Sequence, residues 1–210
     1  MSASSTEIAF TPSVKDIQTR RGSRDAYARL EEKGGFATAI DDSLAAFVGN
    51  IRSFYFATAN RECQPYIQHR GGPKGFLRVL DPHTLAFADF AGNRQYISVG
   101  NLADNPRAML FLMDYTVRRR VKIWGTARVV EDDPELTARL FPGAYRARAE
   151  QAIVFAVTAI DINCPQHIPQ MLFAEDVAEA IAERDRRISA LEAEIARARA
   201  PLAGDAVPSP

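Results

Sequence analysis

Three short polar segments interrupt stretches that otherwise predict strands or plain loops, and their residue types are suited to holding a phosphate group. They are residues 68–72 (Gln-His-Arg-Gly-Gly), 92–102 (Gly-Asn-Arg-Gln-Tyr-Ile-Ser-Val-Gly-Asn-Leu) and 118–122 (Arg-Arg-Arg-Val-Lys). A guanidinium group matches two phosphate oxygens at once, and a helix start adds unpaired backbone N–H groups. We therefore predict that four cationic side chains converge on a dianionic phosphate: Arg70, Arg94, Arg120 and Lys122. The alternative is that each is a solvated surface charge.

Other kinds of site find less support in the sequence. Cys164 and His167 have a spacing found in metal sites, but zinc takes three or four protein ligands and no second such pair is present, so we predict no metal. The sequence also lacks a nucleophile elbow, a phosphate-binding P-loop and a Gly-x-Gly-x-x-Gly fingerprint. Catalysis by an activated serine, use of ATP and Rossmann-type dinucleotide binding are therefore not expected.

The composition is that of an ordinary folded chain. Of 210 residues, 47% are hydrophobic and 25% charged, and 26 Lys and Arg are balanced by 26 Asp and Glu. Nucleic-acid binding is not expected, because no basic excess exists and the arginine run at 118–120 lacks interleaved aromatic residues. Since neither a signal peptide nor a long apolar run is visible, we expect no membrane association and a cytoplasmic protein with reduced thiols.

Seven segments have the pattern of short strands, which favours a meander or barrel over alternating strand–helix units. They are residues 53–58, 65–70, 76–80, 84–90, 108–113, 119–130 and 152–162. The clearest is 119–130, where apolar and polar residues alternate with a period of two. Helices are predicted at 24–33, 42–51, 96–102 and 135–141. The fold class is thus mainly β with flanking helices.

The last part of the chain is different in character. Residues 175–199 are rich in alanine and charge and carry apolar residues close to a heptad spacing, interrupted by Arg184. We predict a long helix that packs on the barrel or against a second subunit. The predicted organisation is an N-terminal helical segment packing on the barrel (1–50), a barrel domain (51–173), this helix (174–200) and a disordered tail (201–210).

Several of these segments follow an order similar to that of one known family. They are the strand at 54–59, Pro-Tyr-Ile-Gln-His-Arg at 65–70, the strand at 84–90, Asn-Leu-Ala-Asp-Asn-Pro at 101–106, a buried strand at 108–113, and a basic strand reaching Gly125. Together they resemble the pyridoxamine 5′-phosphate oxidase-like family over residues 51–162. Segments 68–72, 92–102 and 163–169 further resemble a branch of oxidase-related flavin-binding proteins.

This resemblance implies a six-stranded split β-barrel, usually a homodimer, with FMN in clefts between the subunits. Carried over by position, it implies that Gln68, His69 and Arg70 line the flavin, that Asn93, Arg94, Gln95 and Ser98 lie near its phosphate, and that Arg120 and Lys122 add cationic contacts. The loop with Gln166 and His167 is expected to close over the flavin, with His167 as the candidate catalytic residue. The alternative for His167 is a bond to loop backbone groups.

The sequence departs from the vitamin B6 oxidase itself. Ile97 and Ser98 stand where the oxidase has an Arg-Lys pair, and its C-terminal signature of tryptophan and arginine residues is absent. We therefore expect an FMN-binding oxidoreductase that passes electrons or hydride between the flavin and a small-molecule substrate or electron donor, rather than that oxidase. The alternatives are a non-catalytic flavin-binding or sensing protein, or a split barrel that binds F420 or haem, the last through His69, His83 or His167.

Overall fold

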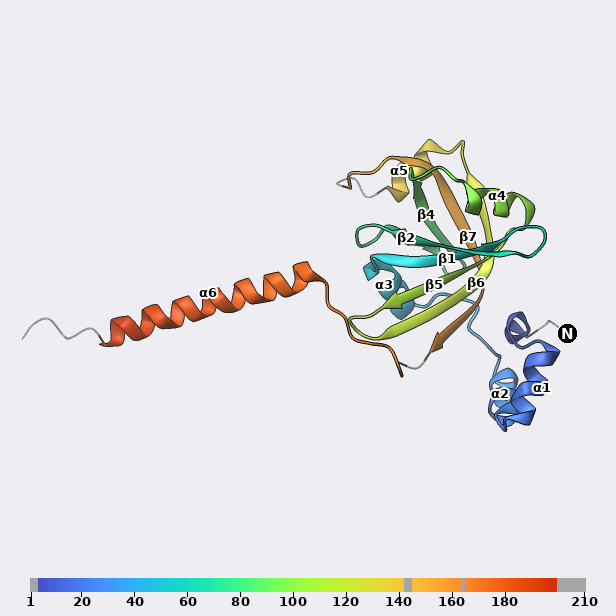
Figure 1. The fold of residues 1–210 in the computed structure, drawn as a ribbon, viewed down its shortest axis with the longest axis horizontal. Helices are drawn as coiled ribbons and strands as arrows, with labels where there is room; N and C mark the ends of the chain where they lie inside the picture. The colour runs from blue at the N-terminus through green and yellow to red at the C-terminus, as the bar shows by residue number, and fades with distance from the viewer. Residues whose placement is uncertain (1–3, 142–144, 164, 200–210) are drawn as a thin grey trace, which may run out of the picture. The chain divides into compact units, whose positions relative to one another are not determined.

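The protein, described here from a computed structural model, is built on one antiparallel sheet; the structure describes residues 4–141, 145–163 and 165–199. Within these residues the sheet has seven strands in the order β2-β1-β5-β6-β7-β4-β3 (Figure 1). They are β1 (Ser53–Ala59), β2 (Pro65–Gly71), β3 (Leu77–Asp81), β4 (Thr84–Phe90), β5 (Arg107–Asp114), β6 (Arg119–Val130) and β7 (Ala149–Asn163). The predicted count of six strands is wrong, because the short edge strand β3 also pairs with β4.

The sheet curls until its two ends face each other. The rings of Phe54 in β1 and Phe87 in β4 lie 5.1 Å apart, edge to face, although β5, β6 and β7 separate these strands in the sheet order. Phe56 reaches the same Phe87 ring at 5.7 Å. Such contacts require the inner face of the sheet to close around a single core, to which buried residues from six of the strands, β1 and β3–β7, contribute. The protein is therefore mainly β, with a barrel-like sheet that stays open between β2 and β3.

Helix α3 (Asp42–Asn50) covers part of this core. Its first turn is capped by the Asp41 carboxylate, which accepts a hydrogen bond of 2.7 Å from the backbone N–H of Leu44. Leu44, Phe47 and Val48 lie on one helical face and are buried in the core, as their spacing predicts. Two further helices contact the sheet, α4 (Ile97–Asp104) and α5 (Pro134–Leu140).

The predicted alternation along β6 is confirmed. Val121, Ile123, Gly125 and Ala127 are buried, whereas the residues that alternate with them are more exposed: Lys122, Trp124, Thr126 and Arg128. Gly125 lies at a register shift, where an added Cβ would stand 1.9 Å from the carbonyl oxygen of Ala156. Only glycine fits at this point, because the neighbouring backbone approaches too closely for any side chain.

The N-terminal segment forms a short 3-10 turn, η1 (Ser5–Ile8), and two helices, α1 (Pro12–Arg20) and α2 (Arg24–Glu32). Glu31 joins the two helices, because it forms ion pairs with Lys15 and with Arg24. The hydrogen bond from Lys15 and the pairing with Arg24 hold the pKa of Glu31 below its ordinary value of 4.5. The segment meets the sheet where the Phe36 ring stacks on Trp124 at 5.7 Å.

The chain divides into two compact units, one ending at Ile168 and one beginning at Pro169. The second unit contains α6 (Ala174–Arg199), in which no residue is buried. The predicted tail at 201–210 lies outside the described residues. In the described part of the chain, no helix combines the length and the apolar character that a membrane span requires.

Candidate functional site

A polar pocket of about 250 Å³ lies at the open edge of the sheet. Its walls come from the inward-facing side chains of β2, the end of β4, residues 92–96, the first turn of α4 and the start of β7. Six of the predicted site residues line it: Gln68, Arg70, Asn93, Arg94, Gln95 and Ser98. Two sequence segments that are about 25 residues apart, 68–72 and 92–102, therefore meet in one place, as predicted.

The pocket contains a largely buried ion pair between Arg70 and Asp89. The two side chains are only 12% and 11% exposed, and Asp89 also accepts a 2.9 Å hydrogen bond from Nε2 of Gln151. Because β2 and β4 stand near opposite ends of the sheet order, this pair ties the two open edges together. Nε of Arg70 is buried and has no hydrogen-bond partner among the described residues. A buried donor of this kind is costly unless a ligand or water satisfies it.

The first turn of α4 forms another wall. Ser98 is 2% exposed, and its hydroxyl donates to Oε1 of Gln68 at 2.9 Å. The helix is held against β1 by Asn101, whose Nδ2 donates to Oγ1 of Thr58 at 3.0 Å. Tyr96, at the N-cap position, has a φ of 53° and makes no side-chain capping hydrogen bond. The first turn of α4 thus lines the pocket and its amides have no side-chain cap, an arrangement that favours anions.

Arg94 and Glu150 form the outer rim. Nη2 of Arg94 lies 3.6 Å from Oε1 of Glu150, which also pairs with Arg148 at 2.8 Å. The Arg94 side chain is 58% exposed, so its pair with Glu150 is weak and can exchange for another anion. In the pocket lining, the positive charges of Arg70 and Arg94 are balanced by the negative charges of Asp89 and Glu150.

His69, Arg120 and Lys122 lie outside this pocket. The alternation of β2 turns His69 away from Gln68 and Arg70 and toward the outer face, where its ring contacts Tyr55 at 5.7 Å. Lys122 belongs to the same outer row and pairs with Asp161 at 3.1 Å.

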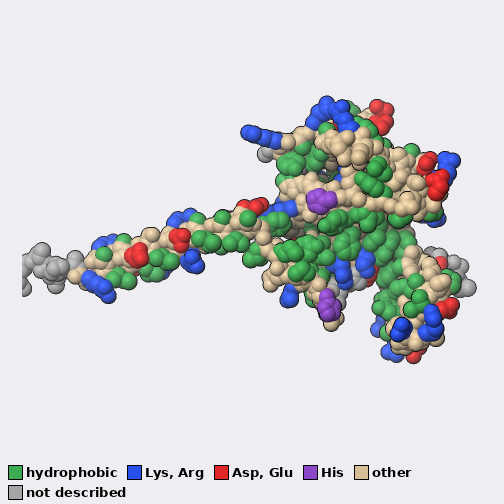
Figure 2. All heavy atoms as spheres, viewed as in Figure 1, with side chains coloured by type: hydrophobic (Ala, Val, Ile, Leu, Met, Phe, Trp, Pro, Cys, Tyr) green, Lys and Arg blue, Asp and Glu red, His purple; other side chains and the backbone are tan. Residues whose placement is uncertain are grey.

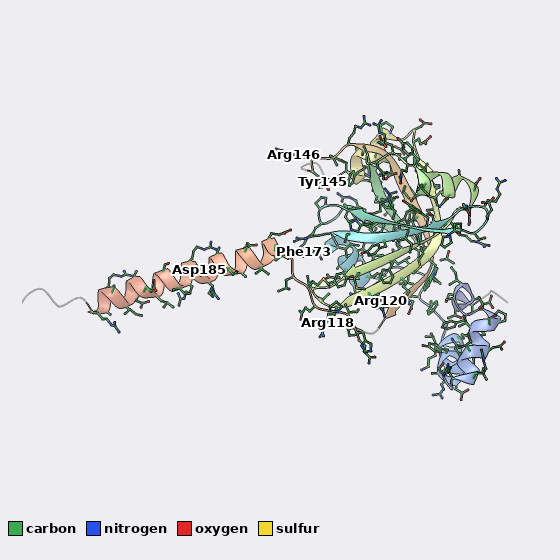
Figure 3. The ribbon with its side chains drawn as sticks, in the orientation of Figure 1. Arg118, Arg120, Tyr145, Arg146, Phe173 and Asp185 are labelled. Atoms are coloured by element: carbon green, nitrogen blue, oxygen red, sulfur yellow. The ribbon has the colours of Figure 1, made fainter. Side chains whose placement is uncertain are left out.

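Arg120 also lies on β6, two residues before Lys122, and Nε of Arg120 is buried without a partner among the described residues. Figure 3 shows Arg118 and Arg120 at the end of the sheet where β5 turns into β6. One copy of the chain thus does not bring the third predicted cationic segment to the pocket.

Gln166 and His167 lie in an exposed turn after β7, and His167 has a φ of 62°. Neither residue lines the pocket. Cys164, the other residue of the predicted metal pair, lies outside the described residues. In the part of the chain that the structure describes, no three His, Cys, Asp or Glu side chains are arranged to hold a metal ion. The third histidine, His83, bonds the carbonyl oxygen of Thr38 at 2.9 Å.

The acidic residues of the pocket were not among the predicted site residues. Asp89 is a carboxylate inside the otherwise apolar and buried strand Thr84–Phe90, and such a residue signals a buried partner. Glu150 carries no comparable signal, since it stands among polar residues at the start of β7. Tyr96 was passed over because its left-handed backbone is visible only in the structure.

The fold defines a class of protein in which a curled antiparallel sheet carries a polar pocket at its open edge. The model of the family described as pyridoxamine 5′-phosphate oxidase matches residues 40–164, which is more than half of the chain. The protein therefore belongs to the pyridoxamine 5′-phosphate oxidase family, as the sequence motifs predict.

Several solved structures are similar to this chain. HupZ of Group A Streptococcus is 17% identical with a TM-score of 0.49, over 63% of this chain and 99% of that one. An FMN-binding protein of Syntrophomonas wolfei subsp. wolfei is 16% identical with a TM-score of 0.46, over 70% and 97%. An F420 reductase is 16% identical with a TM-score of 0.41, over 55% and 94%. No functionally curated protein matches the chain.

Proposed function

We propose that this protein binds FMN with the phosphate in the pocket beside α4, and that it is a flavin-dependent oxidoreductase. The observation that carries the proposal is the donor set around one small pocket. A buried guanidinium with an unpartnered Nε, a buried serine hydroxyl and the uncapped start of a helix all belong to it. Each of these groups donates hydrogen bonds, and phosphate oxygens accept them.

The residues fit a phosphate monoester. Ser98 can rotate its hydroxyl from Gln68 to a phosphate oxygen, and the first-turn amides of α4 add donors beside it. Arg94 can leave Glu150, because a dianion offers it a stronger partner than one shared carboxylate. Arg70 stays paired with Asp89 and contributes its remaining N–H groups. Asn93 and Gln95 add amides at the rim.

The rest of the flavin requires a second surface, since a pocket of about 250 Å³ is smaller than the usual site for a ligand of this size. We propose a homodimer in which the outer face of the other copy covers the pocket. That face carries a cross-strand row in which His69, Tyr55, Phe111 and Lys122 follow one another, with Arg120 nearby. Aromatic and cationic side chains of this kind suit a planar ring that becomes anionic when reduced. In this arrangement, His69, Arg120 and Lys122 of one copy would contact the flavin bound in the pocket of the other copy.

When bound, FMN supplies the electron and hydride chemistry, and the protein supplies binding and orientation. We propose that Gln166 and His167, in the turn after β7, lie over the ring and that His167 donates a hydrogen bond to the flavin or substrate. Vitamin B6 is not the proposed substrate, because Ile97 and Ser98 replace the Arg-Lys pair of the oxidase.

Titration of the purified full-length chain with FMN, followed by flavin fluorescence, tests the binding. We expect a tight complex that keeps its flavin absorbance after desalting, and we expect Ser98→Ala to raise Kd by about tenfold through a lost charged hydrogen bond. Ser189→Ala, an exposed serine in α6, is the matched control and should leave Kd unchanged. Absence of quenching, or equal Kd values for the two variants, would remove FMN from the pocket.

Two further measurements separate the alternatives. Steady-state oxidation of NADH or NADPH with a dye acceptor distinguishes an enzyme from a protein that only binds or senses the flavin. The absorbance spectrum of the protein isolated from its host distinguishes FMN from F420 and from haem, which gives a Soret band. A Soret band that disappears on substitution of His69, His83 or His167 would support haem instead of FMN.

A further inference from the structure

Helix α6 exposes an apolar stripe that Arg184 interrupts. The helix is 26 residues long and none of them is buried. Five aliphatic side chains are between 37% and 50% exposed: Val177, Ile181, Ile188, Leu191 and Ile195. Figure 2 shows apolar side chains exposed along this helix among the charged ones. Because most of the stability of a helix comes from packing of such a face, the stripe requires a partner.

The spacing of the stripe is that of a coiled-coil seam. With Arg184 counted in, the steps from Val177 to Ile195 alternate between four and three residues, which places Ile181, Ile188 and Ile195 at a positions. The d positions are Val177, Arg184, Leu191 and Ala198. Isoleucine fills all three of these a positions and leucine fills the d position at 191, a combination that favours two parallel strands. Arg184 is the single long polar residue of the seam, and one such residue sets the register at some cost in stability.

The charges beside the seam select the same arrangement. In a parallel, in-register pair, Arg187 at a g position faces Glu192 of the second helix, and Glu194 at the next g position faces Arg199. Twofold symmetry repeats both attractive pairs. An antiparallel pair that buries the same seam has two registers. In one, the repulsion of Asp185 by Glu192 cancels the attraction of Arg187 to Glu194; in the other, Asp185 and Arg187 each face their own counterparts, which is repulsive. Asp185 also lies 3.7 Å from Arg184 and offsets the charge in the seam.

We propose that α6 pairs with α6 of a second copy of this chain as a parallel, in-register, two-stranded coiled coil. At a rise of about 1.5 Å per residue, the paired helices extend over roughly 40 Å. The proposal does not depend on the flavin or on the pocket. It assigns the predicted C-terminal helix to an interface between copies rather than to the surface of its own barrel.

Disulfide trapping in the full-length chain tests this pairing. The background carries Cys63→Ser and Cys164→Ser, so that no native thiol reacts. Ala198→Cys places a thiol at a d position, where parallel helices bring it against its own counterpart. Ala193→Cys, at an f position on the opposite side of the helix, is the matched control, and both alanines are exposed in the single chain. We expect the dimer linked at 198 to form at least about tenfold faster than the one at 193, because pairing raises the effective thiol concentration.

Charge exchange gives a second and independent readout. In the chain that carries Ala198→Cys, Glu192→Arg should slow cross-linking about tenfold. The two symmetry-related attractions between Arg187 and residue 192 of the other helix then become repulsions. Adding Arg187→Glu to the same chain should restore the original rate. Equal rates at 193 and 198, no linked dimer at 198, or a double exchange that fails to restore the rate would each overturn the parallel coiled coil.

Discussion

The ion pair between Arg70 and Asp89 should be a main support of the open edge of the sheet, and Arg70→Met tests this. The variant leaves the Asp89 carboxylate buried with only the Gln151 amide as a partner. Removal of one member of a buried pair typically costs about 3–5 kcal/mol. Because both side chains retain a small exposure, 12% and 11%, we expect the lower end, about 3 kcal/mol. For a chain of this size, that corresponds to a fall in Tm of roughly 6–12 °C.

The assay is urea unfolding followed by circular dichroism, without added ligand. Arg61→Met is the matched control, because its pair with Asp104 is 75% and 44% exposed and should be worth less than about 1 kcal/mol. The double variant Arg70→Met, Asp89→Leu removes both charges, so it should recover most of the loss. If Arg70→Met were as stable as Arg61→Met, the ion pair with Asp89 would not hold the two edges of the sheet together.

Three other predictions concern separate parts of the molecule. Arg94→Ala should weaken FMN binding by about 1–3 kcal/mol in a fluorescence titration while leaving the Tm unchanged, because its side chain is exposed; an unchanged Kd would remove it from the site. Trp124→Ala should loosen the N-terminal segment, because it removes the stack on Phe36, and limited proteolysis should then cut within residues 4–36 sooner than in the unaltered chain. Glu31→Gln should lower the Tm at neutral pH. Since the pKa of Glu31 is lowered by folding, the difference from the unaltered chain should shrink as pH falls below 4.5; a constant difference would contradict this.

The elements that local patterns define were predicted well. The alternation along β6 and the helical face of α3 both depend on residues within one element, and the core they bury is the one observed. The number of strands implied by the family resemblance was wrong, whereas the seven segments indicated by residue type all form strands. Residue type predicted the strand count better than the family resemblance did. The difference is β3, a short edge strand that pairs with only one neighbour, β4.

The candidate site was predicted only in part, because its assembly depends on the curl of the sheet. Alternation along β2 already separates His69 from Gln68 and Arg70, but it does not reveal which face is the pocket. That assignment comes from the approach of β4 to β2 across the open edge, which no local pattern encodes. The same reason explains why Arg120, three strands along from β2, is not in the pocket of its own chain.

The charge balance of the pocket also follows from this geometry. The arginines were predicted to form a cationic cluster, yet each has a carboxylate partner from another strand, Asp89 from β4 and Glu150 from β7. In the proposed complex, a phosphate would therefore not enter a site of strong positive potential; it would exchange with a carboxylate at the exposed rim and leave the buried pair intact. This division assigns stability to Arg70 and ligand exchange to Arg94. It also explains how a chain without the Arg-Lys pair of the vitamin B6 oxidase can still offer a phosphate enough donors, because Ser98 and the amides of α4 carry no charge that must first be neutralised.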